Sequence, residues 1–240
     1  MTQVDSAFVL AAGLGKRMRP LTATRPKPLV RVAGKALIDH AFDRIEDAGV
    51  PHVVVNAHYL ADALEAHVAG ARRDRAFALD LSDERDQLLE TGGGLVRAMP
   101  LLRGDPILTV NSDNIWTEGP TNSIRRLTER WDDAAMDALL LVVPQARAAG
   151  HRGPGDFHMA SDGRLARRKP GRVAPFVYTG IQLIARRLCD DAPEGPFSTN
   201  ILWDRAAANG RLFGLAHDGA WFDVGSPASI PIVEAALDHG

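Results

Sequence analysis

A short apolar run that opens directly into a glycine-rich loop constrains this chain more than any other feature. Residues 6–11 read SAFVLA, and residues 12–20 follow as AGLGKRMRP. The apolar run is typical of a buried strand, and a strand that leads into a glycine loop usually starts an α/β sheet. The sequence therefore predicts an α/β protein that begins with this strand.

Strand-like and helix-like segments then alternate up to residue 143. Apolar residues at helical spacing predict a helix over about 37–45, which Gly49 and Pro51 end before the apolar run VVVN at 53–56. The same alternation predicts further strands near 77–82, 107–111 and 138–143, and further helices near 59–68, after the glycines at 92–94, and near 121–131. This order predicts a mainly parallel sheet with helices on both faces.

The pattern changes after Pro144, where a polar, glycine-rich stretch covers residues 149–155. Ser226 and Pro227 are typical of an N-cap and a first helical position, and they predict a C-terminal helix. Between these segments we expect strands near 156–159, 164–167, 176–184 and 211–216, and a helix near 198–208. We interpret residues 1–240 as a single domain, with a core over 1–145, a lid-like elaboration that returns to the core over 146–225, and a helix over 226–240.

Length, charge and cysteine content exclude several classes of protein. A chain of 240 residues suits one large α/β domain. No apolar run approaches the ~18 residues of a membrane span, and the net charge of 28 − 30 = −2 gives no overall basic field for a nucleic acid. Cys189 is the only cysteine and no signal segment is visible, so we expect a cytoplasmic protein without disulfides.

The glycine loop at residues 13–18 predicts a site for several phosphate groups. It has Met18 where a dinucleotide fingerprint needs its third glycine, and no Gly-Lys-Ser/Thr closes a P-loop. Loop amides beside Lys16, Arg17 and Arg19 favour an anion, and a triphosphate fits better than a dinucleotide. A tight turn with surface cations is an alternative interpretation.

Two further segments carry candidate ligand-binding groups. Asp113 follows the predicted strand at 107–111 and lies at the sheet edge where open α/β folds bind ligands, although a solvated turn aspartate is the alternative. The glycines at 92–94 lie in the segment LETGGG between a predicted strand and a helix. Glycine there lets a flat ligand approach the backbone, and a flexible helix start is the alternative.

The segment LAAGLGKRMRPLT at 10–22, followed by PKPL at 26–29, closely resembles the signature of the sugar-1-phosphate nucleotidyltransferases. The resemblance extends over nearly the whole chain through NSDNIW, HRGPGDF, TGI and WFDVGS, at 111–116, 151–157, 179–181 and 221–226. It implies a Rossmann-like nucleotidyltransferase fold, with a nucleotide-binding core over 1–145 and a sugar-binding part over 146–225. LETGGG is similar to the form found in the N-acetylmuramate α-1-phosphate uridylyltransferases of cell-wall recycling.

The resemblance also implies roles for individual residues. Arg17 would polarise the nucleotide phosphates, Lys27 would contact the sugar phosphate, and Asp113 with Asp223 would bind catalytic Mg²⁺. The expected nucleotide-binding residues are Leu10, Ala11, Ala12, Gly13, Gly15, Lys16, Glu90, Gly92 and Gly93. The expected sugar-binding residues are Asn111, Asp156, Lys169, Thr179, Gly180 and Asn200, with Asn56 as a further candidate. A solvated loop lysine remains the alternative for Lys169, and a polar helix residue for Asn200.

Together these expectations describe a magnesium-dependent enzyme that transfers a nucleotidyl group from a nucleoside triphosphate to a sugar 1-phosphate and releases pyrophosphate. The expected substrates are UTP and N-acetylmuramate 1-phosphate, in peptidoglycan recycling. Guanylyl transfer to mannose 1-phosphate and thymidylyl transfer to glucose 1-phosphate are alternatives, and a non-catalytic sugar-nucleotide sensor is an alternative of another class. A nicotinamide oxidoreductase would need an acidic residue where Asn56 stands. We expect no nucleic-acid or membrane partner, and a monomer or small homo-oligomer.

Overall fold

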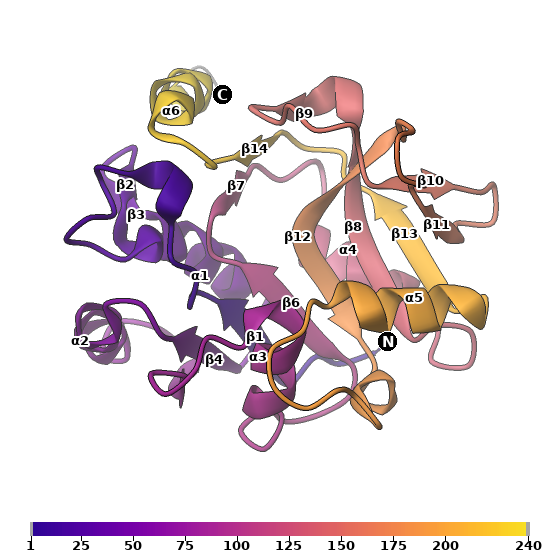
Figure 1. The fold of residues 1–240 in the computed structure, drawn as a ribbon, viewed down its shortest axis with the longest axis horizontal. Helices are drawn as coiled ribbons and strands as arrows, with labels where there is room; N and C mark the ends of the chain where they lie inside the picture. Colours follow the sequence, from indigo (N-terminus) through magenta and orange to yellow (C-terminus); the bar gives the residue numbers. More distant parts are fainter. Residues whose placement is uncertain (1, 239–240) are drawn as a thin grey trace.

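A central sheet of nine strands organises the computed structural model, which describes residues 2–238 (Figure 1). Seven strands follow the order β11-β10-β12-β6-β1-β4-β5, and β8 and β13 extend the sheet from β12. The strands of this sheet are β1 (Ala7–Leu10), β4 (His52–Ala57), β5 (Ala78–Asp83), β6 (Ile107–Asn111), β8 (Ala138–Pro144), β10 (Phe157–Met159), β11 (Leu165–Arg167), β12 (Phe176–Ile184) and β13 (Leu212–Ala216). The expected mixed α/β fold with a mainly parallel sheet is confirmed.

Parallel pairing brings several strand ends to one edge of the sheet. β1 lies between β4 and β6 and pairs with both in parallel, so Leu10 stands opposite Asn111. β12 runs antiparallel to β6 and to β8, with an irregularity between Tyr178 and Gln182. The loops after β1, β4 and β6 therefore meet at the edge where ligands of open α/β folds bind.

Helices cover both faces because side chains along each strand alternate between the two faces. In β1, Phe8 packs in the core below α3 and α5, whereas Val9 packs in the core below α1, α2 and α4. The helices are α1 (Leu37–Asp47), α2 (Ala61–Ala71), α3 (Glu90–Ala98), α4 (Ser123–Arg130), α5 (Asn200–Ala208) and α6 (Ile230–Asp238). No helix within residues 2–238 is long and apolar enough to cross a membrane.

A small second sheet lies beside the central one and was not expected from the sequence. It has the order β7-β14-β9, from β7 (Asn114–Trp116), β14 (Trp221–Asp223) and β9 (Ala148–Ala149). β14 pairs antiparallel with β7, and Asp223 stands opposite Asn114. This register brings the two acidic residues of the site together, because Asp113 directly precedes Asn114.

Short elements complete the fold around this second sheet. Single-turn 3₁₀ helices form at η1 (Lys16–Met18), η2 (Lys27–Leu29), η3 (Gln145–Arg147), η4 (Arg186–Cys189) and η5 (Pro227–Ser229), and a hairpin forms from β2 (Arg31–Val32) and β3 (Lys35–Ala36). Ser226 and Pro227 stand at the N-cap and first position of η5, which leads into α6. Met18, Val30, Phe222 and Val233 share a separate core that joins the first loop to the C-terminal part.

Two helix boundaries differ from the expectation. The C-terminal α-helix, expected over 226–240, begins at Ile230 after η5, and residues 239–240 lie outside the described part of the chain. The helix expected after the glycines at 92–94 begins earlier, at Glu90, so the glycines lie within α3. Glycine disfavours helix interiors by about 1 kcal/mol. Here the amides of Gly92 and Gly93 both donate to the carbonyl oxygen of Phe197, and this contact to another part of the chain holds the first turn.

Candidate active site

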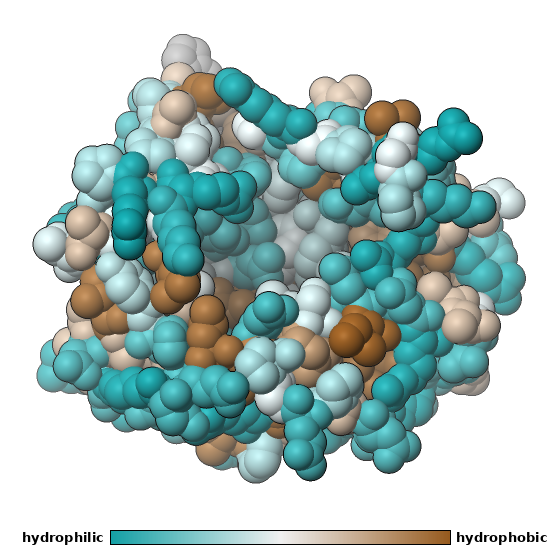
Figure 2. Space-filling view, viewed as in Figure 1, coloured by the Kyte–Doolittle hydropathy of each residue, from teal (hydrophilic) through white to brown (hydrophobic). Residues whose placement is uncertain are grey.

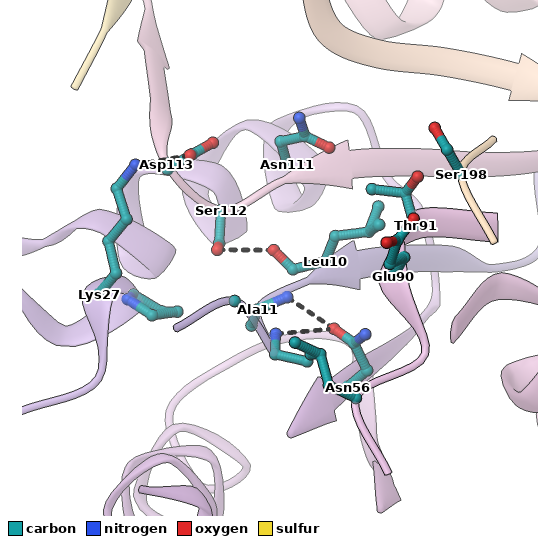
Figure 3. Close-up of a pocket in the computed structure, with 14 residues that line it drawn as sticks. Leu10, Ala11, Lys27, Asn56, Glu90, Thr91, Asn111, Ser112, Asp113 and Ser198 are labelled. Carbon is teal, nitrogen blue, oxygen red and sulfur yellow. Dashed lines mark hydrogen bonds and ion pairs between the residues drawn. The ribbon is translucent and has the colours of Figure 1, made fainter. Parts of the chain in front are cut away.

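A cavity of about 380 Å³ opens where the carboxyl ends of β1, β4 and β6 meet. Figure 2 shows this face of the molecule hollowed near its centre, with hydrophilic side chains along much of the rim. The cavity is lined by Leu10, Ala11, Ala12, Gly13, Lys27, Pro28, Asn56, Leu88, Glu90, Thr91, Asn111, Ser112, Asp113 and Ser198 (Figure 3). It therefore gathers residues from the first loop, the start of α3 and the segment after β6.

The first loop takes its shape from one glycine. Gly15 has φ +58°, in the left-handed region, and a Cβ there would come within 3.0 Å of Thr22 Cγ2. Thr22 Oγ1 donates to the carbonyl oxygen of Gly15 at 2.8 Å, which closes the loop onto itself. Lys16 and Arg17 remain exposed after this turn. Their charges are therefore free to meet an anionic ligand at the rim.

Asn56 holds the beginning of this loop through side-chain hydrogen bonds. Its Oδ1 accepts from the amides of Ala11 and Ala12, at 2.6 and 3.2 Å, as Figure 3 shows. These two amides are thus bonded within the protein, although the loop was expected to offer its amides to phosphate. Asn56 was only a secondary candidate for ligand contact, and a local sequence pattern carries no signal for a bond to a loop 44 or 45 residues away.

Asp113 and Lys27 form an ion pair at the mouth of the cavity. Lys27 Nζ donates to Asp113 Oδ2 at 2.6 Å, and the lysine side chain is largely buried. Ser112, the preceding residue, donates through Oγ to the carbonyl oxygen of Leu10 at 2.7 Å. The strand end that carries Asp113 is thereby tied to the strand end that carries the first loop.

Asp223, from the C-terminal part of the chain, and Arg17, from the first loop, lie at the same place. A Cβ at Gly225 would lie 3.1 Å from Asp223 Oδ1 and 3.4 Å from Arg17 Nη1, so both side chains close over this glycine. Burial raises the pKa of Asp223, and the negative charge of Asp113 raises it further. The positive charges of Lys27 and Arg17 act in the opposite direction but are smaller causes. The four residues expected to carry the chemistry are thus brought together.

The two carboxylates fit a hard divalent cation. Carboxylate oxygens are ligands that Mg²⁺ prefers, and the mutual repulsion of Asp113 and Asp223 is relieved when a cation lies between them. Among residues 2–238 no group of three or more His, Cys, Asp or Glu side chains is arranged to hold a metal. Oxygens of a bound phosphate and of water would have to complete the coordination, as is usual for Mg²⁺.

The LETGGG segment divides into residues that face the cavity and residues that pack behind it. Glu90 and Thr91 line the cavity, and Glu90 has φ +60°, a conformation that costs a non-glycine residue about 1 kcal/mol or more. A Cβ at Gly92 would lie 2.3 Å from the Phe197 ring, and a Cβ at Gly93 would lie 2.4 Å from the carbonyl oxygen of Gly195. Gly92 and Gly93 therefore serve helix packing here. They were expected to bind the nucleotide, but neither lines the cavity.

On the other side of the cleft, β12 places Thr179 and Gly180 differently from each other. Gly180 has φ +86°, and a Cβ there would lie 2.9 Å from Asn111 Cβ, so it adjoins a cavity residue. Thr179 is fully buried and its Oγ1 donates to the carbonyl oxygen of Leu141 at 2.8 Å. Its carbonyl oxygen accepts from Trp221 Nε1. The Thr179 side chain, expected to bind sugar, is turned into the core instead.

The remaining sugar-binding candidates do not all lie together. Asp156 and Asn200 line a second cavity of about 310 Å³, where Asp156 Oδ2 accepts from the amide of Tyr178 at 2.9 Å. A chamber of about 190 Å³ shares Leu10, Thr91, Asn111 and Ser198 with the first cavity, and Tyr178 and Trp203 with the second. Lys169 is exposed and lines none of these three cavities. Ser198, Tyr178 and Trp203 were not expected from the sequence.

Comparison with known proteins gives a consistent result. Residues 6–151 match the family model described as nucleotidyl transferase. The chain is 45% identical to an N-acetylmuramate alpha-1-phosphate uridylyltransferase from Caulobacter vibrioides, over 96% of both proteins. It is 30% identical to the enzyme of the same name from Neisseria meningitidis, over 95% of this chain and 96% of that protein. A UDP-glucose pyrophosphorylase structure complexed with UDP-glucose has the same fold, with a TM-score of 0.82, 15% identity and 99% coverage of both chains.

Proposed function

The chain belongs to the sugar-1-phosphate nucleotidyltransferase family, and from this premise we propose that it transfers a uridylyl group from UTP to N-acetylmuramate 1-phosphate. The reaction would release pyrophosphate and form UDP-N-acetylmuramate, with Mg²⁺ as cofactor. The observation that carries the proposal is the convergence of Arg17, Lys27, Asp113 and Asp223 at one cavity mouth. The substrate pair is supported by the names of two relatives that align over nearly the whole chain.

The reaction is a direct displacement that needs no covalent enzyme intermediate. An oxygen of the sugar phosphate attacks the α-phosphorus of UTP, the new P–O bond forms as the bond to the β-phosphate oxygen breaks, and pyrophosphate carries the electron pair away. The attacking oxygen is already ionised, so no general base is needed. The enzyme must instead bring two anions together, which makes electrostatic stabilisation and positioning the main sources of rate.

The charged residues at the mouth supply that stabilisation. Lys27, which donates to Asp113 at 2.6 Å, would neutralise the incoming sugar phosphate. Arg17 lies exposed beside Asp223 and would neutralise the triphosphate. Asp113 and Asp223 would hold Mg²⁺, which when bound supplies positive charge to the phosphate oxygens.

The rest of the cleft would orient the two substrates. Leu88, Glu90 and Thr91 line the same cavity as the first loop, and they would offer a wall for a nucleobase. Asn111 and Ser198 stand where the first cavity joins the chamber leading to Asp156 and Asn200. We assign this chamber and the second cavity, which Asp156 and Asn200 line, to the sugar.

A substrate panel tests the proposal. Pyrophosphate release would be measured with UTP, GTP, CTP and dTTP against the 1-phosphates of N-acetylmuramate, N-acetylglucosamine, glucose and mannose, with Mg²⁺ present. We expect the highest kcat/KM for UTP with N-acetylmuramate 1-phosphate. A preference for GTP with mannose 1-phosphate, or for dTTP with glucose 1-phosphate, would overturn the substrate pair. Nucleotide binding with no turnover for any pair would indicate a sensor.

A further inference from the structure

Behind the first loop lies a buried carboxylate that none of the proposed chemistry uses. Glu84 directly follows β5, is 0% exposed, and does not line the cavity. Its Oε1 accepts from Asn56 Nδ2 at 2.8 Å. Burial raises the pKa of this carboxyl group, because desolvation disfavours its charged form. A buried charged side chain destabilises a fold unless a hydrogen-bond or ion-pair partner compensates for its lost hydration.

The partner of Glu84 is the residue that holds the nucleotide loop. Asn56 has one amide oxygen and one amide nitrogen, and both are used: Oδ1 accepts from Ala11 and Ala12, and Nδ2 donates to Glu84. A carboxylate acceptor on one side therefore selects the amide orientation that presents oxygen to the loop. The three bonds form one chain of contacts from β5 through β4 to the loop after β1.

Helix α3 closes over the same pair. A Cβ at Gly94 would lie 2.8 Å from Glu84 Oε1 and 3.0 Å from Asn56 Nδ2, so the helix can approach this closely only with glycine. The same helix begins with Glu90, which lines the cavity. Glu84 thus adjoins α3 directly and reaches the loop after β1 through Asn56, without lining the cavity itself.

We propose that Glu84 is a positioning residue for nucleotide binding: it orients Asn56, and Asn56 in turn fixes Ala11 and Ala12 on the floor of the cavity. Without Glu84, Asn56 Nδ2 loses its acceptor in a buried place, where an unsatisfied amide is unfavourable. The amide then turns or shifts to find another partner and releases the two loop amides. The loop becomes less ordered before the nucleotide binds, and binding has to restore it.

Kinetics of single and double variants test the coupling. We expect Glu84→Ala to raise the KM for the nucleotide about tenfold, with kcat and the KM for the sugar phosphate within about threefold of wild type. Glu84→Gln keeps an acceptor oxygen and should recover most of the loss. In the Asn56→Ala background, Glu84→Ala should add little, because its effect passes through Asn56. The proposal would be overturned if Glu84→Ala raised the nucleotide KM by the same factor in the wild-type and Asn56→Ala backgrounds. It would also be overturned if Glu84→Ala impaired kcat and both KM values to the same extent.

Glu118 provides a matched control. It is a partly buried carboxylate that accepts from Trp116 Nε1 and from the Ser123 amide and hydroxyl, and it does not line the cavity. Glu118→Ala should lower the unfolding temperature without changing the nucleotide KM. A nucleotide KM that rises equally in both alanine variants would show that general destabilisation, and not positioning, is responsible.

The kinetic test rests on the proposed function, whereas amide hydrogen exchange in the ligand-free protein does not. Glu84→Ala should speed exchange at Ala11 and Ala12 while leaving Phe8 and Val9 within β1 protected. Unchanged exchange at the two alanines would overturn the positioning role even if the enzyme turns over its substrates. Faster exchange combined with no turnover of UTP and N-acetylmuramate 1-phosphate by wild type would overturn the proposed function alone.

Discussion

The side of the cleft that we assign to the nucleotide is formed by the loop after β1 with Asn56 and the start of α3. Its candidate residues lie mostly at the ends of parallel strands and are tied to one another. The side that we assign to the sugar is formed by β12 with Asp156, Lys169 and Asn200, and its candidates come from an irregular strand, an exposed loop and a helix start. Ala11 and Ala12 are bonded to Asn56, and Ser112 is bonded to Leu10. On the sugar side, Thr179 faces the core and Asp156 bonds the amide of Tyr178.

This difference indicates which positions can change without loss of the reaction. On the nucleotide side, each strand end is held by its neighbours through parallel pairing and through buried side chains. The sugar side has fewer such constraints, and its residues belong to two linked cavities. We expect substitutions on the nucleotide side to affect the reaction, and those on the sugar side to divide into structural and specificity effects.

The largest effect is expected at the two aspartates where the sides meet. Asp113→Asn and Asp223→Asn should each lower kcat/KM by about 10³-fold or more, because each removes one of the two negative charges that would hold Mg²⁺. Removal of divalent ions from wild type with a chelator should have a comparable effect, reversed by added Mg²⁺. Unfolding temperatures should stay within a few degrees of wild type, or rise for Asp223→Asn, whose charge is disfavoured by burial. Full activity in either variant would disprove the metal assignment.

Two lysines provide the sharpest comparison between the sides. Lys27→Met should reduce kcat/KM about 100-fold, because it removes a partly buried charge paired with Asp113. Lys169→Met should change it less than about threefold, because Lys169 is exposed and lines none of the three cavities. Steady-state kinetics with both substrates varied measures the two effects. A large rise in the sugar-phosphate KM for Lys169→Met would show that the sugar side closes over its ligand.

Substitution of the packed glycine Gly92 in LETGGG should affect stability more than substrate binding. Gly92→Ala is expected to lower the free energy of unfolding by about 1–3 kcal/mol, because its Cβ would overlap the Phe197 ring. Gly13→Ala is the matched control, since a Cβ there meets no atom within 4 Å in the part of the chain that the structure describes. Denaturant unfolding measures both. Equal stability of the two variants would contradict the packing role of Gly92.

The smallest effect is expected at Thr179. Thr179→Val removes the buried hydroxyl that donates to Leu141 and should lower the free energy of unfolding by about 1 kcal/mol. The KM for the sugar phosphate should stay unchanged, because the hydroxyl points away from the cleft. A raised sugar-phosphate KM with unchanged stability would return Thr179 to the substrate-binding residues.

Local pattern was enough to predict most strands and helices of the core. The run at 6–11, the helical spacing at 37–45 and the strand at 107–111 all depend on apolar periodicity, which survives folding because buried faces must be apolar. The small sheet of β7, β14 and β9 was missed because its strands have two or three residues each, too few for a period. The early start of α3 was missed because a contact with Phe197, about a hundred residues away, holds its glycines.

The sequence by itself determined the family and predicted the charged residues that we propose for the site. Arg17, Lys27 and the two aspartates are ionisable residue types, and each lies in a motif that is continuous in the chain. Only the tertiary structure decided which groups are available to a ligand. It used the amides of Ala11 and Ala12 for Asn56, turned Thr179 inward and placed a buried Glu84 behind the loop. Those outcomes depend on hydrogen bonds between distant strands, which each polar group needs once it is buried.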